Sequence, residues 1–163
     1  MTFSQTEVLR YIDQYEKGVG ELEGALAAAP LEALYHKPAP SEWSNHQIVC
    51  HCSDVEIVGA MRMLSLAADP DPLIVAFDPD DWANLFYNPD HSLEVALAAV
   101  RGTRTRTAET LRSLPEHIWN KIGRHTVNGE ASLAKTLASW SGHLHEHADQ
   151  IRDNVRHYES ASN

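Results

Sequence analysis

The sequence predicts an all-α fold, a bundle of four long helices. Two observations support it: apolar residues recur at helical spacing in four long segments, and the alternating pattern of half-buried strands is scarce. The chain of 163 residues contains no internal repeat or composition break, so we expect a single domain over 1–163 with a core over about 4–158. A chain of this length can bury roughly 70% of its unfolded surface.

The first two helices begin at capping boxes, in which a serine and a residue three positions later cap each other's backbone N–H groups. Ser4 with Glu7 opens the first helix, and Pro30 follows its end. Ser44 with Gln47 opens the second, which we expect to run to about Ala67. Trp43 and Ile48 flank this start as a hydrophobic staple. One stripe of the second helix carries Ile48, His51, Val55, Val58 and Arg62.

A long loop separates the second and third helices. It spans Asp69 to Pro89, and its aromatic residues Trp82, Phe86 and Tyr87 favour packing, on one short helical turn, over disorder. The third helix is expected from near Ser92 to Pro115.

A second loop ends with the turn signal Asn128-Gly129. The fourth helix is capped near Ser132 and runs to about Tyr158, with Leu133, Leu137, Trp140 and Ile151 on its buried face.

Charge and composition exclude several classes of function. The net charge of −10 argues against nucleic-acid binding, because phosphates require a basic surface. No apolar run approaches the ~18 residues that span a bilayer, and the N-terminus lacks the features of a secretory signal, so we expect a cytoplasmic protein. Cys50 and Cys52 point about 200° apart on a helix, which excludes a bond between them and indicates two small buried thiols.

Three histidines form the candidate site. His143 and His147 are four residues apart on the fourth helix, so both rings reach one side of it, on the face that should be buried. His51 lies on the inward stripe of the second helix. If the two helices face each other at this level, three imidazoles converge and leave a fourth position of a metal ion open, as in catalytic sites. The alternative is that they are hydrogen-bonded core histidines.

Further candidate residues lie near this cluster. Asp54 and Gln150 each follow a histidine by three positions and could orient its ring. Arg62, further along the His51 stripe, could bind an anionic group of a substrate, and the loop with Asp78, Asp81 and Trp82 could close over the pocket and contact that substrate.

An overlapping motif offers another interpretation. His143-x-x-Glu146-His147 fits the inverted zinc-peptidase pattern, with Glu146 as the general base. That class needs a further ligand well downstream, and few residues follow His147. His145, turned about 160° from its neighbours, is expected to be solvated.

These residues together resemble the DinB/YfiT-like family of four-helix metalloproteins. The resemblance rests on Glu42-Trp43-Ser44 before the second helix, on His51 with Asp54, Glu56 and Arg62, on Gly129-x-x-Ser-Leu133, and on His143-x-x-x-His147-x-x-Gln150-Ile151. It implies an up-down-down-up bundle, a divalent metal on the three histidines, and a homodimer. Relatives of this kind include bacillithiol and mycothiol S-transferases and maleylpyruvate isomerase.

Three functions follow. The first is a metal-dependent enzyme of a small molecule, a thiol-dependent S-transferase that uses a low-molecular-weight thiol as co-substrate. The second is a metal-dependent hydrolase, with Glu146 or a loop aspartate as base. The third is a non-catalytic dimeric binding module with a structural metal. Zinc or nickel is the expected ion, with iron and manganese as further candidates.

Overall fold

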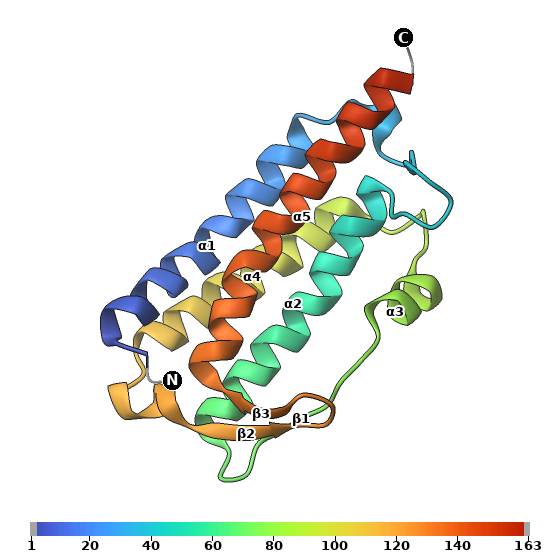
Figure 1. The fold of residues 1–163 in the computed structure, drawn as a ribbon. Helices are drawn as coiled ribbons and strands as arrows, with labels where there is room; N and C mark the ends of the chain where they lie inside the picture. Colours follow the sequence, from blue (N-terminus) through green and yellow to red (C-terminus); the bar gives the residue numbers. More distant parts are fainter. Residues whose placement is uncertain (1–2, 162–163) are drawn as a thin grey trace.

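The computed structural model describes residues 3–161, and it contains four long helices that form a bundle (Figure 1). The helices are α1 (Gln5–Ala27), α2 (Asn45–Ala68), α4 (Leu93–Arg112) and α5 (Leu133–Ala161). In Figure 1, α1 and α5 run upward while α2 and α4 run downward. Around the bundle, α5 packs between α1 and α2, and α4 packs on their other side. The predicted up-down-down-up arrangement is confirmed.

The predicted capping boxes set the first residues of α1 and α2. The backbone N–H of Glu7 donates to Ser4 Oγ (3.3 Å), and the Glu7 carboxylate accepts from the Ser4 N–H (2.9 Å). Ser44 and Gln47 exchange the same two bonds at the start of α2. Because α2 is fixed at Ser44, the position of His51 along the bundle is fixed too.

Short helices fill the connections. Two 3-10 helices lie at the ends of the bundle, η1 (Leu31–Ala33) and η2 (Glu116–Asn120). The long loop contains α3 (Pro79–Phe86), so its aromatic residues occupy two turns where one was expected. Asp78 caps α3, because its Oδ1 accepts from the N–H groups of Asp80 and Asp81. The carboxylate of Asp78 therefore stabilises the first turn of α3.

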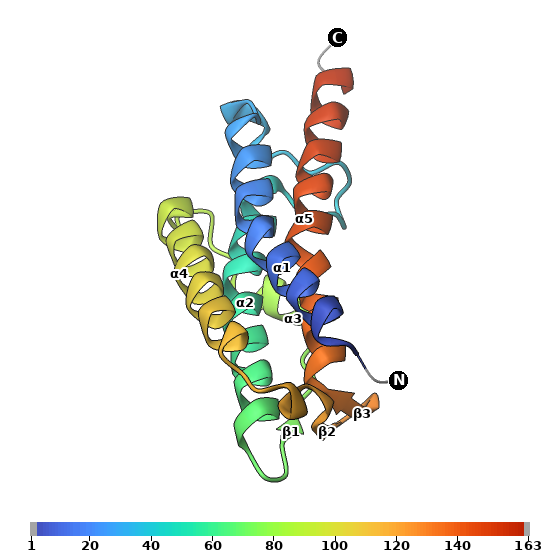
Figure 2. The ribbon, with the colours of Figure 1, turned by 90° about the vertical axis from the view of Figure 1, so that its left-hand side faces the viewer.

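The loops also form a small sheet, which the sequence analysis did not predict. Its strands are β1 (Leu73–Ile74), β2 (Ile122–His125) and β3 (Gly129–Ser132). β2 and β3 form an antiparallel hairpin, and β1 pairs in parallel with β2. Gly129 ends the hairpin turn at a φ of 78°, a conformation that glycine adopts without a steric penalty. Figures 1 and 2 show this sheet below the bundle, where α1 and α5 begin.

The core is divided along the bundle axis into two apolar clusters. The cluster nearer the sheet contains Ile12, Met63, Trp119 and Leu137, and the other contains Leu22, Ile48, Val100 and Ile151. None of the helices in residues 3–161 is long and apolar enough to cross a membrane.

Candidate metal centre

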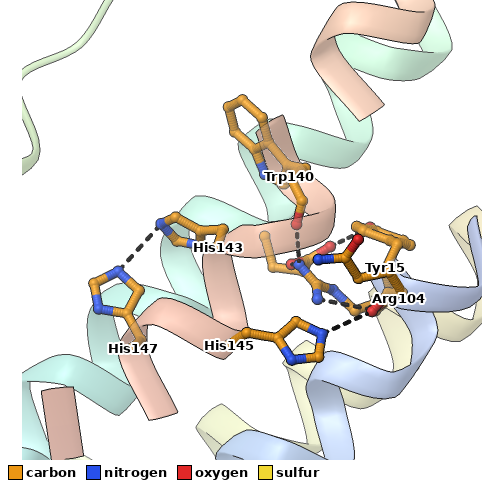
Figure 3. A network of polar contacts seen from close by, with 8 residues as sticks. Tyr15, Arg104, Trp140, His143, His145 and His147 are labelled. Carbon is orange, nitrogen blue, oxygen red and sulfur yellow. Dashed lines mark hydrogen bonds and ion pairs between the residues drawn. The ribbon is translucent and has the colours of Figure 1, made fainter. Parts of the chain in front are cut away.

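Three histidines from two helices meet on one side of the bundle. His51 comes from α2, and His143 and His147 come from adjacent turns of α5. One donor nitrogen from each ring lies within 4.8 Å of the other two. Figure 3 shows His143 and His147 pointing to the same side of α5, while His145 points to the opposite side.

The distances suit a common ion. The Nε2 atoms of His143 and His147 are 3.2 Å apart. Two nitrogens bound at about 2.0–2.1 Å to one tetrahedral ion are separated by about 3.3 Å. The ring of His51 is 4.9 Å from that of His147 and 5.6 Å from that of His143, measured between centroids. All three donors are nitrogens, which suit zinc, nickel, iron and copper.

Two neighbours hold the rings in place. Gln150 Oε1 lies 2.9 Å from Nδ1 of His147, so Nδ1–H donates and Nε2 keeps its lone pair for the cluster. Trp43 packs against two of the rings: its centroid is 4.5 Å from that of His51, and it is stacked on His147 with the centroids 6.3 Å apart. Nδ1 of His143 is buried and has no hydrogen-bond partner within residues 3–161.

The surroundings keep the histidines neutral. Burial lowers the pKa of His51 to about 3, and the nearby His147 contributes to the shift. Burial and the two other histidines lower the pKa of His143 to about 3 as well. For His147, burial lowers the pKa while the bond to Gln150 partly opposes this. Neutral imidazoles are the form that binds metal.

Hollows adjoin the cluster on two sides. One, lined by His147, Gln150 and Trp43, also contains the acidic residues Glu42 and Asp80. Another lies against His51 and is bounded by Trp82 and Asp54; its 20 Å³ holds about one water. It shares Cys50, Asp54 and Phe86 with a larger cavity of about 280 Å³. A small molecule therefore has space next to the histidines.

The other predicted residues lie at different distances from the cluster. Trp82 faces the hollow beside His51, and its ring is tilted against that of Phe77 with the centroids 4.5 Å apart. Asp54 lines the same hollow but makes no hydrogen bond to His51 in the described chain, and burial raises its pKa. Arg62 lies about three turns of α2 away and lines a separate cavity.

The structure gives little support to the peptidase interpretation. Glu146 is exposed and forms no hydrogen bond with the three histidines within residues 3–161, so its catalytic role stays a prediction. The third imidazole comes from α2, upstream of the motif. The expectation for His145 was wrong: it is half-buried, and its Nε2 lies 3.0 Å from the backbone oxygen of Gln14 on α1.

Beneath the cluster lies a buried ion pair whose role the sequence analysis missed. Glu56 and Arg104 are both fully buried, and their charged groups lie 2.8 Å apart. Arg104 also donates to the backbone oxygens of Tyr15 (2.8 Å) and Trp140 (3.1 Å), and the Tyr15 hydroxyl donates to Glu56. The network joins all four long helices. Its contact on α5 is at Trp140, three residues before His143. Its signal was present, because Arg104 follows Val100 by four positions on the buried stripe of α4.

Comparison with known proteins places this bundle and its histidines in a family. The sequence model of the DinB superfamily matches residues 14–151, a range that includes His51, His143 and His147. The chain belongs to the DinB superfamily. The match confirms the resemblance drawn from the motifs of α2 and α5.

Three further similarities agree with this membership. The chain is 27% identical to a protein of Oceanobacillus iheyensis named "Putative metal-dependent hydrolase", over 90% of this chain and 82% of the relative. A Bacillus licheniformis protein with the same kind of name is 29% identical over 85% and 84%. Among solved structures, this chain is similar to Bacillus subtilis YfiT, which is described as a probable metal-dependent hydrolase with an unusual four-helix bundle topology. The TM-score is 0.87 at 21% identity, and the match covers 97% of this chain and 91% of YfiT. This last likeness shows the fold.

Proposed function

We propose that this DinB superfamily member is a metal-dependent enzyme that hydrolyses a small molecule, with one divalent ion on His51, His143 and His147. The observation that carries the proposal is the convergence of three neutral imidazoles beside open hollows. Three protein ligands leave a coordination position for water or substrate, whereas structural sites are closed by four. The names of the relatives agree with this reaction class.

The residues around the cluster have distinct tasks in this proposal. When bound, the ion lowers the pKa of a coordinated water or thiol and polarises a substrate carbonyl. Gln150 fixes the ring of His147, and Trp43 shields two of the three rings from solvent. Asp80 and Glu42, which line the hollow beside His147, are placed to accept a proton from an attacking water.

Thiol S-transfer is the second candidate. Hydrolysis needs a base, such as Asp80 or Glu42, to take the proton of the attacking water. An attacking thiolate needs no such base, because its proton has already left to solvent. Its sulfur would form a bond to an electrophilic carbon while the bond to the leaving group breaks.

Metal content tests the site itself. Protein purified without a histidine tag should contain about one divalent ion per chain, measured by plasma mass spectrometry. His51→Ala and His143→Ala should each lose that ion, while His117→Ala, an exposed histidine outside the cluster, should retain it. Absence of metal in the unsubstituted protein after incubation with zinc, nickel or manganese would contradict the proposal.

Activity assays distinguish the reactions. Hydrolysis of activated ester and amide panels without any thiol, lost in His147→Ala, would support the hydrolase. Conjugation of alkyl halides or epoxides only when a low-molecular-weight thiol is present would support the transferase. If neither azide nor a thiol perturbs the spectrum of the cobalt-substituted protein, the ion has no open position, and the non-catalytic binding module becomes the better interpretation.

The metal, the assembly and the location extend this proposal. We propose zinc or nickel as the ion, since both are among the metals that imidazole ligands suit. We also propose a homodimer, which the resemblance implies, and a cytoplasmic protein. Light scattering of the purified protein at micromolar concentration tests the homodimer, and fractionation of cells that produce the protein tests its location.

A further inference from the structure

Arg62 is a half-buried cation without an acidic partner. Its guanidinium donates to the backbone oxygen of Val75 (2.6 Å) and lies over the rings of Phe77 (5.1 Å) and Trp140 (5.5 Å). No carboxylate lies within ion-pair distance of it in residues 3–161. The two aromatic rings hold the guanidinium in one orientation and leave further N–H groups to bind another acceptor.

Within residues 3–161, Arg62 is the one arginine that is at least partly buried and has no carboxylate partner, whereas Arg10 and Arg124, which also lack one, are exposed. Six of the other arginines pair with carboxylates: Arg101, Arg104, Arg106, Arg112, Arg152 and Arg156. The net charge is −10, so acidic side chains are abundant. Partial burial of an unpaired charge costs free energy. A position where no carboxylate of residues 3–161 neutralises this charge is suited to an anion from outside.

The cavity beside Arg62 has the donors that an anion needs. Its volume is about 220 Å³, and it lies between the β2–β3 hairpin and the first turns of α5. Lys135 supplies a second positive charge, and Thr136 and Ser139 supply hydroxyls. Nδ1 of His125 accepts hydrogen bonds from the N–H groups of Val127 and Asn128 (3.2 and 3.1 Å). The ring proton is therefore on Nε2, which can donate a hydrogen bond to an anion.

One acidic residue lines the same cavity. Glu130 is exposed on β3, and it forms no ion pair with Arg62 or Lys135 in the described chain. With Arg62 and Lys135 positive and Glu130 negative, the cavity keeps an excess of positive charge. Glu130 should weaken the binding of an anion by repulsion.

The cavity is next to the histidine cluster. Trp140 separates the two, since Arg62 lies over its ring and the ring of His143 is 6.2 Å from it. We propose that this cavity binds the anionic group of a small molecule, a carboxylate or a phosphate, with Arg62 as its principal ligand. The identification of that molecule as the substrate rests on the proposed function, whereas the binding itself does not.

Titrations followed by NMR of ¹⁵N-labelled protein test the site. Inorganic phosphate and succinate, each added at constant ionic strength, distinguish phosphate from carboxylate. At least one should shift the amide signals of residues 128–136. Arg62→Gln should weaken that binding by about 10-fold or more, because charge-assisted hydrogen bonds are lost. Arg124→Gln is the control, since this exposed arginine on β2 has no carboxylate partner among the described residues either, but does not line the cavity.

Further variants keep the test decisive if Arg62→Gln disturbs the loop that it anchors at Val75. Lys135→Gln should weaken the binding, and Glu130→Gln should strengthen it several-fold. Absence of shifts with both anions, or equal losses in Arg62→Gln and Arg124→Gln, would overturn the inference. His143→Ala should retain anion binding. If the unsubstituted protein binds an anion but no metal, only the proposed function is refuted. If it binds metal but neither anion, only this inference is refuted.

Discussion

At the scale of single residues, the orientation of His147 depends on Gln150. This amide fixes which ring nitrogen carries the proton, and no other side chain in the described chain is hydrogen-bonded to Nδ1 of His147. Removing such a partner of a metal ligand costs about 10–100-fold in metal affinity. We therefore expect Gln150→Ala to bind zinc 10–100-fold more weakly, measured by competition with a chromophoric chelator.

A matched variant is available on α1. Gln14→Ala removes an exposed amide side chain, since only the backbone oxygen of Gln14 contacts His145. Its zinc affinity should equal that of the unsubstituted protein. Equal affinities for Gln150→Ala and Gln14→Ala would show that Gln150 does not position His147.

The lowered pKa values predict how pH affects the stability of the metal-free protein. The pKa values of His51 and His143 are about 3 in the folded state, against about 6.5 for histidine in an unfolded chain. Between these values the unfolded state binds more protons, so the free energy of unfolding falls as pH decreases from about 6.5 toward 3. Each histidine contributes up to about 1.4 kcal/mol per pH unit.

Urea denaturation at pH 7, 6 and 5 measures this dependence. His143→Gln removes one of the titrating groups, so its stability should fall less steeply below pH 6.5. His117→Gln, an exposed control, should keep the full slope. A slope in His143→Gln as steep as in the unsubstituted protein would contradict the assignment.

The buried pair of Glu56 and Arg104 has its own consequence for stability. Glu56→Gln would leave the guanidinium of Arg104 charged and fully buried without a carboxylate. Breaking a buried pair in this way costs about 3–5 kcal/mol. We expect that loss in the free energy of unfolding measured with urea. Glu56→Gln combined with Arg104→Met, which removes both charges, should recover a substantial part of it, and a double variant no more stable than the single one would argue against the pairing.

At the scale of elements, the contact between α2 and α5 depends on a glycine. A Cβ at Gly59 would lie 1.8 Å from Nε1 of Trp140, which therefore packs directly on the α2 backbone. Gly59→Ala must displace Trp140, and overpacking of this kind costs about 1–3 kcal/mol. Because Trp140 separates Arg62 from His143, the displacement should also shift the NMR signals of both sites.

The control lies on α4. A Cβ at Gly102 meets nothing within 4 Å, so Gly102→Ala should stabilise the helix by about 0.5–1 kcal/mol through its higher helix propensity. Thermal denaturation of both variants measures these opposite effects. A stabilised Gly59→Ala would show that α2 and α5 are not in such close contact.

The elements also show what could be predicted from the sequence. Capping serines and helical periodicity predicted the four long helices, because both are local properties of the chain. The β2–β3 hairpin was missed although Asn128-Gly129 is a typical hairpin turn, since the flanking strands have only four residues each and alternate weakly. β1 was beyond such reasoning, because its two residues pair with a strand about fifty positions away.

At the scale of the whole molecule, the arrangement of helices decides which predicted residues meet. Periodicity placed His51 and His143 on buried faces but did not specify that α2 and α5 are neighbours. The resemblance to the DinB family supplied that information. Arg62 shows the limit of the stripe argument: it shares a face of α2 with His51, yet a separation of 11 residues, about 16 Å along a helix, places it beside another cavity.

The same arrangement predicts that metal binding stabilises the entire fold. The ligands belong to helices whose sequences are far apart, so the complete site exists only in the folded chain. An ion that binds only the folded state stabilises it by about 2.7 kcal/mol at a concentration 100 times its dissociation constant. Zinc should therefore raise the midpoint of thermal unfolding. His143→Ala should abolish the increase, and His157→Gln should retain it. This control removes a member of the other imidazole pair, in which His36 Nε2 lies 3.3 Å from His157 Nδ1. If His157→Gln lost the stabilisation and His143→Ala kept it, the stabilising ion would be at that pair instead of the proposed centre.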